Sequence, residues 1–164
     1  LIDEKKYECF IANDNSNGQL VISGRIDHLN KFVDDLKNLR IKNITLPVSG
    51  PFHCKLMNKA TIKMEPEIKK LEFNIGEKIL ISNVTANEMK NPEEIKKLLI
   101  KQIESRVRWR ESIIYMIKKG VNHFIEIGPG KVLSGLIKRI DKTVIVDAIN
   151  SEEDINNIKK NDKF

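Results

Sequence analysis

The chain has 164 residues and a formal net charge of +6, and 40% of its residues are hydrophobic, 32% charged and 5% aromatic. This balance is typical of a soluble globular chain with one domain or parts of two, and it argues against disorder. No apolar run approaches the roughly 20 residues that span a bilayer, so we expect no membrane partner. The basic charge favours acidic partners, but the few aromatic residues do not favour nucleic acid.

The beginning of the chain predicts a hairpin. Two strand-like runs, residues 5–12 and 19–23, flank the polar stretch 13–18, which is typical of a turn. On pattern alone, Asn13 and Asn15 are expected to be turn residues that make local side-chain hydrogen bonds.

A helix is predicted to begin at Asp27, whose side chain is a good N-cap. Its apolar residues recur on one face, namely Leu29, Phe32, Val33, Leu36 and Leu39. Three basic residues, Lys37, Arg40 and Lys42, lie off this face or just beyond it, so we expect them to face solvent. A strand at 44–48 completes the order strand, strand, helix, strand, the latter part of a ferredoxin-like βαββαβ unit.

The stretch LPVSGPFHCKLM, residues 46–57, leads from a predicted strand end through a Gly-Pro turn to His53. A helical pattern follows, with apolar residues at Leu56, Met57, Ala60, Met64, Ile68 and Leu71. The partial positive charge of a helix N-terminus favours the neutral imidazole, which can accept a proton. His53 is therefore a candidate general base, although a lone histidine at such a position is more often a capping or packing residue.

The two cysteines do not indicate a metal site, a disulfide framework or a catalytic thiol. Cys9 and Cys54 form no metal-type cluster and no disulfide framework, so we expect no metal and a reducing compartment. Cys54 follows His53 directly, but neighbouring residues on a helix point about 100° apart, so no Cys–His pair is predicted.

The middle of the chain predicts a strand at 79–84 and a helix that begins at Asn91-Pro92-Glu93-Glu94, with an N-cap, a proline at N1 and a glutamate at N3. Gln102 falls on the same helical face as Ile95, Leu98 and Leu99. We therefore expect its side chain to point towards the core and to need a polar partner.

The last third predicts alternating helices and strands. A helix with Trp109 and Ile113 inward is expected to end at Gly120, and residues 124–127 predict a buried strand. We interpret the Gly-Pro-Gly turn at 128–130 as a packing turn, because it fits neither G-x-G-x-x-G nor a P-loop. A helix through Ile140, a strand at 144–146 and a short helix capped by Ser151 complete the prediction.

Four stretches, in the same order, resemble the malonyl-CoA:acyl carrier protein transacylases. They are FIANDNSNGQLVISG (10–24), LPVSGPFHCKLM (46–57), ISNVTAN (81–87) with QIESRVRWRESIIYM (102–116), and FIEIGPGKVLSGLIKRI (124–140). The resemblance implies an α/β fold. Residues 1–48 would be the latter part of a ferredoxin-like small subdomain, and residues 49–164 the C-terminal part of a large α/β-hydrolase-like acyltransferase subdomain.

One signature of that family has no counterpart here. The family's nucleophile lies on a Gly-His-Ser-x-Gly elbow upstream of these motifs, and no G-x-S-x-G occurs in this sequence. The family's arginine for the malonyl carboxylate and its oxyanion-hole donors also lie upstream. We therefore expect the chain to be the C-terminal part of a longer enzyme, to need the upstream part as a partner, and to be inactive alone.

The resemblance implies roles near the base. His53 would be the catalytic base, and a backbone carbonyl at Gln102 would orient it, as an aspartate does in a serine-protease triad. Asn13 and Asn15 would hydrogen bond to the pantetheine arm. Phe52 is a candidate for lining the acyl pocket, with a place in the core as the alternative.

Two further expectations concern the carrier protein and the turn after Gln102. Lys37, Arg40 and Lys42 are candidates for docking an acidic acyl carrier protein, and a solvated helix face is the alternative. Arg106 stands where the family usually has proline, which predicts a different local turn.

The implied function is malonyl transfer from coenzyme A to acyl carrier protein in fatty-acid biosynthesis, by a Ser-His ping-pong mechanism. The coenzyme A thioester, malonyl-CoA, is then a substrate, and no cofactor is expected. Two alternatives stay open: a non-catalytic carrier-protein docking module, and the acyltransferase domain of a multidomain synthase. The compartment would be the cytoplasm in a bacterium and a plastid-type organelle in a eukaryote.

Overall fold

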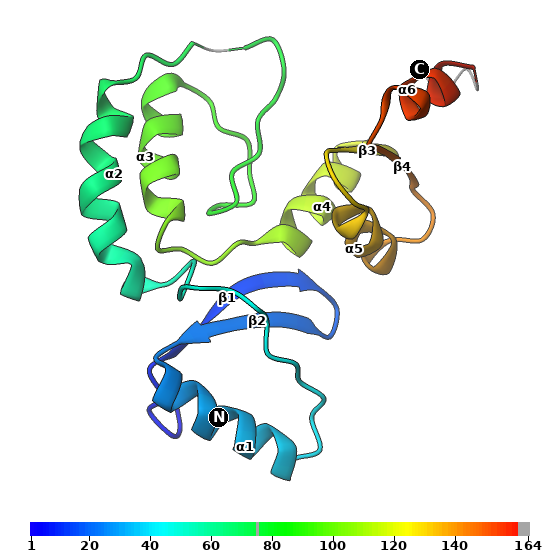
Figure 1. Ribbon diagram of the computed structural model, residues 1–164. Helices are drawn as coiled ribbons and strands as arrows, with labels where there is room; N and C mark the ends of the chain where they lie inside the picture. Colours follow the sequence, from blue (N-terminus) through cyan, green and yellow to red (C-terminus); the bar gives the residue numbers. More distant parts are fainter. Residues whose placement is uncertain (75, 161–164) are drawn as a thin grey trace.

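The computed structural model describes residues 1–74 and 76–160 (Figure 1). In chain order its elements are β1 (Cys9–Ser16), β2 (Gln19–Gly24), α1 (Ile26–Asn38), the 3-10 helix η1 (Lys55–Met57), α2 (Asn58–Lys70), α3 (Pro92–Gln102), α4 (Trp109–Lys118), β3 (His123–Ile127), α5 (Val132–Ile140), β4 (Ile145–Ile149) and α6 (Glu152–Lys160). No helix among these residues is long and apolar enough to cross a membrane.

The first two strands form the predicted antiparallel hairpin, but β1 begins four residues later than expected. Asn13 and Asn15 belong to β1, and the turn between the strands is reduced to residues 17–18. The pairing with β2 runs as far as Ser16↔Gln19, and a distant segment also pairs with β1: the Val107 N–H donates to the Ala12 carbonyl (2.8 Å), and the Asp14 N–H donates to the Val107 carbonyl (2.9 Å). These bonds hold as a strand the residues that local composition predicts as a turn.

The helix α1 begins at Ile26, one residue before the predicted cap. Asp27 lies in its first turn, where its carboxylate accepts hydrogen bonds from Arg25 at 3.0 and 3.1 Å. The predicted apolar face is the packed face: Phe32 is buried, and its ring meets Tyr7 edge-on at 6.0 Å between centroids. Leu39 lies beyond the helix end and is exposed.

Two predicted strands are wrong. Residues 44–48 form no strand, and Ile44 and Val48 are exposed. Residues 79–84 are reduced to an isolated bridge between Ile81 and Glu88. Alternating apolar residues form a strand only when a neighbouring strand satisfies their backbone groups, and within the described residues 44–48 have no such neighbour.

The helices α2 and α3 pack side by side (Figure 1). The predicted start of α3 is confirmed, because the Asn91 side chain accepts a hydrogen bond from the Glu94 N–H at 2.8 Å. Glu94 in turn accepts from the Lys90 N–H at 2.8 Å. This cap fixes where α3 begins, and the helix of eleven residues ends at Gln102.

The C-terminal part is a β-α-β unit. The strands β3 and β4 pair in parallel from His123↔Ile145 to Ile127↔Ile149, and α5 connects them. A core of Ile113, Ile137 and Val144 joins this unit to α4. The Glu126 carboxylate accepts from the N–H groups of Leu133 and Ser134, so β3 itself caps the first turn of α5.

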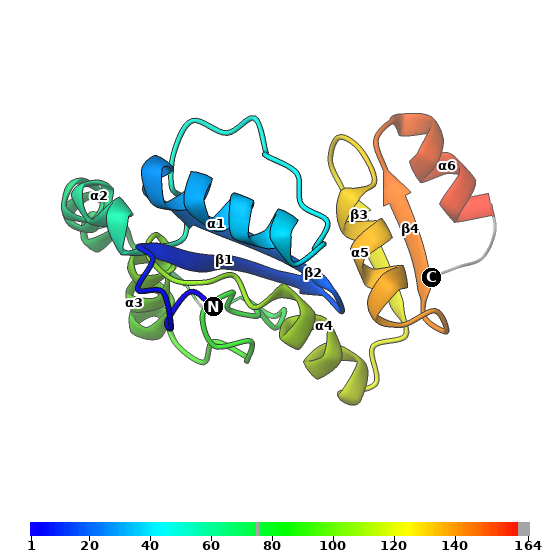
Figure 2. The ribbon, with the colours of Figure 1, turned by 90° about the horizontal axis from the view of Figure 1, so that it is seen from below.

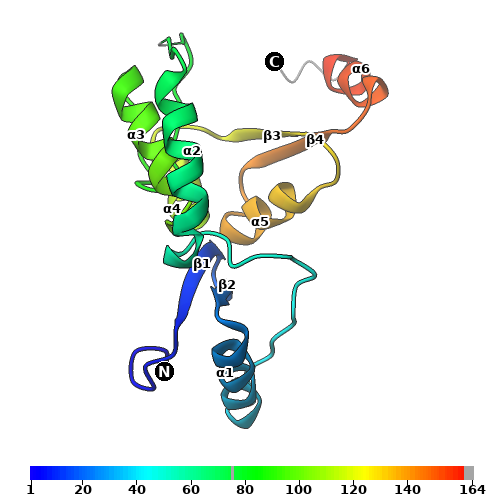
Figure 3. The ribbon, with the colours of Figure 1, turned by 60° about the vertical axis from the view of Figure 1, so that its left-hand side comes forward.

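The elements extend from a common centre. Figure 2 shows the β1–β2 hairpin between α1 on one side and α4 on the other, and contacts of α1 with β2 and of α4 with β1 agree. Figure 3 shows α1, the α2–α3 pair and the β3–β4 unit as three arms that point in different directions.

Candidate functional site

His53 lies in the loop just before η1, and its ring meets the end of α3. The Nδ1 atom is 3.1 Å from the Gln102 carbonyl oxygen, 49 residues away in the sequence. A carbonyl oxygen only accepts hydrogen bonds, so Nδ1 carries the proton in this contact. In the neutral ring, Nε2 then has the free lone pair that a general base needs.

The His53 backbone has a φ of 60°, a region that residues other than glycine adopt only rarely. Hydrogen bonds on either side hold this turn. The Ser23 hydroxyl donates to the Phe52 carbonyl (2.8 Å), and the buried Cys54 thiol donates to the Pro51 carbonyl (3.1 Å). The Ser23 contact could not be predicted from residue type, because no local pattern connects β2 to this loop.

Two helix ends meet at His53. The ring precedes η1 by two residues, as predicted, but its Nδ1–H faces the C-terminus of α3. Carbonyl groups in a last helical turn have no partner within the helix and carry partial negative charge. The Gln102 carbonyl is one of these groups, and it accepts the Nδ1–H of His53. The Gln102 side chain itself is half-buried, whereas Ile95 and Leu98 on the same face are buried.

Hydrogen bonds from Arg106 and Arg108 to Glu111 hold the segment that follows Gln102. Arg108 and Arg106 both donate to the Glu111 carboxylate, Arg106 at 3.2 Å, and Arg108 also donates to the Thr85 carbonyl at 3.3 Å. The hydrogen bond from Arg108 lowers the pKa of Glu111. Arg106 is therefore part of a cluster that fixes the turn after Gln102.

A second ion pair, which the sequence did not predict, joins β1 to α4. Arg110 donates to both carboxylate oxygens of the buried Asp14, at 3.0 and 2.9 Å. This bidentate contact raises the pKa of Arg110. Asp14 was predicted to lie in a turn, where a charged residue is ordinary, and its partner lies 96 residues away.

An open cavity of about 700 Å3 lies beside the base, lined by Leu1, Ile2, Asp3, Cys9, Phe10, Ile11, Leu20, Ile22, Phe32, His53, Cys54, Lys55, Glu104 and Arg106. The predicted substrate residues Phe52, Asn13 and Asn15 are not among these lining residues, and Phe52 is 46% exposed. A second hollow of about 290 Å3, between α5, β4 and α6, contains none of the predicted site residues.

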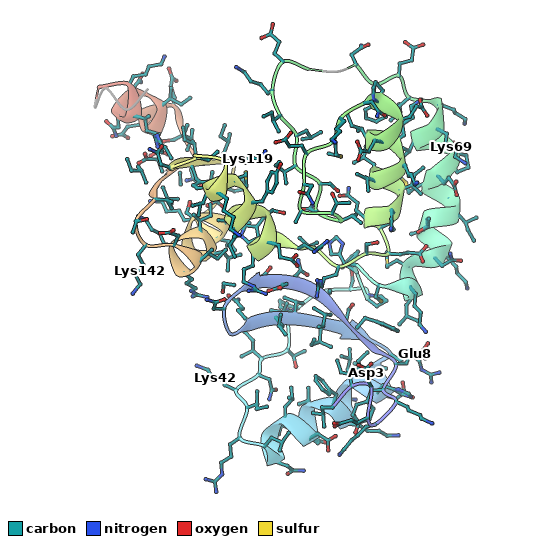
Figure 4. The ribbon with its side chains drawn as sticks, turned by 180° about the vertical axis from the view of Figure 1, so that it is seen from behind. Asp3, Glu8, Lys42, Lys69, Lys119 and Lys142 are labelled. Carbon is teal, nitrogen blue, oxygen red and sulfur yellow. The ribbon has the colours of Figure 1, made fainter. Side chains whose placement is uncertain are left out.

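The predicted carrier-docking residues are all exposed. Lys37 pairs with Asp34 at 3.1 Å, which offsets part of its charge. Arg40 adopts a φ of 58° just past the end of α1, and Figure 4 shows Lys42 projecting from the loop that follows. The structure thus puts these residues on solvent-exposed surface but does not bring them to the His53 ring.

The other two histidines have structural contacts. His28 Nδ1 accepts from the Glu8 N–H at 2.7 Å, and His123 Nε2 lies 2.8 Å from an Asp147 carboxylate oxygen. Within the described residues, no group of His, Cys, Asp and Glu is arranged to hold a metal ion.

The chain was compared with protein families, with curated sequences and with solved structures. No protein-family model matches the chain. A malonyl CoA-acyl carrier protein transacylase of Staphylococcus aureus (strain COL) is 40% identical over 152 residues, which are 92% of this chain and 49% of that protein. The solved structure of a transacylase with the same name from Clostridium perfringens superposes with a TM-score of 0.90 at 37% identity, over 97% of this chain and 51% of that one.

The chain is a homologue of the malonyl CoA-acyl carrier protein transacylases. It shares the α/β fold of these transacylases and spans about half their length. Another similar structure is a malonyl-transacylase in complex with a type II PKS acyl-carrier protein, with a TM-score of 0.90 and 32% identity over 96% of this chain and 52% of that one.

Proposed function

We propose that this chain supplies the general base for malonyl transfer from coenzyme A to acyl carrier protein. The observation that carries the proposal is the contact between His53 Nδ1 and the Gln102 carbonyl, which leaves Nε2 available as a proton acceptor. The homology supports the reaction, since the relatives that match the chain are named as transacylases of this kind. The nucleophilic serine would come from the half of the transacylase that this chain does not match.

In the first half-reaction, His53 Nε2 takes the serine hydroxyl proton while the serine oxygen attacks the malonyl thioester carbon. The carbon–sulfur bond breaks, and the coenzyme A sulfur receives that proton from the imidazolium. In the second half-reaction, Nε2 takes the proton of the carrier thiol while its sulfur attacks the malonyl ester carbon. The carbon–oxygen bond to serine breaks, and the serine oxygen receives that proton from the imidazolium. One ring thus acts as base and then as acid in each half.

The Gln102 carbonyl at the end of α3 would act on His53 as the aspartate carboxylate does in a Ser-His-Asp triad. It fixes the protonated nitrogen, and it faces the imidazolium that forms in both halves. The cavity beside His53 offers room for the acyl group and the thiol-bearing arm. Phe52, Asn13 and Asn15 remain predictions for substrate contact.

The proposal is tested with the longest natural protein that contains this chain, by comparing His53→Ala with Gln102→Ala. Loss of His53 should lower the transfer rate by about 100-fold or more, the usual effect of losing a positioned base. Gln102→Ala keeps the backbone carbonyl, so its rate should stay within about threefold of the parent. Transfer from malonyl-CoA to carrier protein is measured at saturating substrate.

Two outcomes would contradict the mechanism. Transfer by His53→Ala within a few-fold of the parent would make the histidine structural. Malonylation of a serine in the 164-residue chain alone, detected by mass spectrometry, would place the nucleophile inside it. A matched control is His28→Ala, because that ring accepts one backbone hydrogen bond near β1 and should not affect the rate per folded molecule.

A further inference from the structure

Both sides of the His53 site are attached to the same hairpin. On the histidine side, the Ser23 hydroxyl of β2 donates to the backbone carbonyl just before His53, at 2.8 Å. On the Gln102 side, two backbone hydrogen bonds of Val107 join the segment after α3 to β1, at 2.8 and 2.9 Å. The β1–β2 hairpin therefore sets where the histidine loop and the end of α3 lie relative to each other.

A buried ion pair strengthens the attachment on the Gln102 side. Asp14 on β1 is 5% exposed, and its two carboxylate oxygens accept hydrogen bonds from Arg110 in the first turn of α4, at 3.0 and 2.9 Å. Val107 lies three residues before Arg110, so the ion pair and the backbone hydrogen bonds fix the same short stretch of chain on β1. Bidentate, charge-assisted hydrogen bonds are stronger and more directional than those between neutral backbone groups.

The position of the Gln102 carbonyl decides which nitrogen of His53 carries the proton. It lies 3.1 Å from Nδ1 and holds the proton there, which leaves the lone pair on Nε2. A neutral imidazole without such an acceptor favours the proton on Nε2, and that tautomer has no lone pair at the proposed basic atom. The N–H···O range is about 2.7–3.2 Å, so a small displacement of the carbonyl would break this hydrogen bond.

We infer that the Asp14–Arg110 pair positions the proposed base: it holds the segment after α3 on β1 and so keeps the Gln102 carbonyl against the imidazole Nδ1. Neither member of the pair lines the cavity beside His53, so both act through the chain that leads to Gln102. The inference rests on the proposed function for the role of His53 as base. The tautomer of the ring, however, can be measured without any reaction.

The test uses the longest natural protein that contains this chain, with its histidines labelled with 15N. NMR at about pH 8, where an ordinary imidazole is neutral, reports the tautomer of His53, whose signal is the one that His53→Ala removes. In the parent, the proton is expected on Nδ1. Asp14→Asn should shift the ring mainly to the Nε2–H tautomer. It should also lower the rate of malonyl-enzyme formation about tenfold, with the KM for malonyl-CoA within about twofold of the parent.

Two further variants separate positioning from a general loss of stability. Arg110→Lys keeps the positive charge but loses the bidentate contact, so it should give a smaller shift in the same direction and replaces Asp14→Asn if that variant does not fold. The matched control is Glu88→Gln. Glu88 accepts a hydrogen bond from the Tyr115 hydroxyl of α4 at 2.9 Å and lies outside the hairpin, so tautomer and rate per folded molecule should match the parent.

The tautomer and the rate together decide the outcome. An unchanged His53 tautomer in the folded Asp14→Asn or Arg110→Lys variant would overturn the inference, whatever the rate, and so would a parent ring with its proton on Nε2. An equal shift in Glu88→Gln would also overturn it, because any loosening of α4 would then suffice. A shift to the Nε2–H tautomer with an unchanged rate would keep the positioning role and contradict the proposed function instead.

Discussion

Glu111 has a pKa below its ordinary value, because the Arg108 guanidinium hydrogen bonds to its carboxylate. The folded state therefore favours the ionised form more than the unfolded chain does. Its contribution to stability is fully present above the unfolded pKa, about 4.3, and is lost as the pH falls through the lower folded value.

We predict that Glu111→Gln lowers the free energy of unfolding at pH 7 by up to about 1 kcal/mol, the scale of a partly exposed ion pair. The difference from the parent should shrink as the pH falls from 5 towards 3, because acid removes the same charge from the parent. Urea unfolding at several pH values measures this. A difference that stays constant over that range would show that the carboxylate charge does not stabilise the fold.

The candidate site was only partly predictable residue by residue. His53 was a candidate from its place just before a helix, although the strand predicted before it does not form, and only the resemblance to the family favoured a base over a packing residue. The contact of His53 with Gln102 could not be predicted from residue types, because every residue has a backbone carbonyl. Only the resemblance to the family indicated this contact. Ser23 and Asp14 make equally specific contacts, but their partners are 29 and 96 residues away, beyond any local pattern.

At the scale of elements, the Asp14–Arg110 pair fastens α4 to β1. We predict that Asp14→Asn lowers the free energy of unfolding by about 1–3 kcal/mol, because it leaves the Arg110 guanidinium without its carboxylate and weakens two charge-assisted bonds. The measurement is the urea midpoint at pH 7.

The matched control is Asp34→Asn. Asp34 also forms a carboxylate–cation pair, with Lys37, but both side chains are well exposed, so the change should stay within about 0.5 kcal/mol. Equal effects of the two substitutions would mean that the Asp14–Arg110 pair adds nothing beyond surface charge.

Elements whose formation depends on local signals were predicted well. The α3 start has its whole cap within five residues, and the Phe32 face of α1 follows from helical periodicity. Strands depend on partners instead. Residues 13–16 are a strand because β2 pairs with them and Val107 pairs with Asn13, and residues 44–48 are not, although their pattern alternates. The division at residues 48 and 49 into two subdomains stays a prediction.

At the scale of the whole molecule, positive charge gathers where α1 leads into the His53 loop. Lys37 is partly offset by Asp34, so Arg40 and Lys42 should contribute most of the attraction for an acidic carrier protein. Charges at an interface rim act mainly on association rate and on its salt dependence. They should therefore affect the carrier step and not the reaction with malonyl-CoA.

We predict that changing Lys37, Arg40 and Lys42 to Glu in the longest natural protein raises the KM for carrier protein about tenfold or more at low salt, where screening is weakest. Formation of the malonyl-enzyme should be nearly unchanged, and added salt should reduce the difference from the parent. The same reversal of Lys63, Lys69 and Lys70 on α2 controls for net charge, because Figure 4 shows Lys69 at a different end of the molecule from Lys42. If both triple variants raise the KM equally, the effect is one of overall charge, and the carrier protein docks elsewhere.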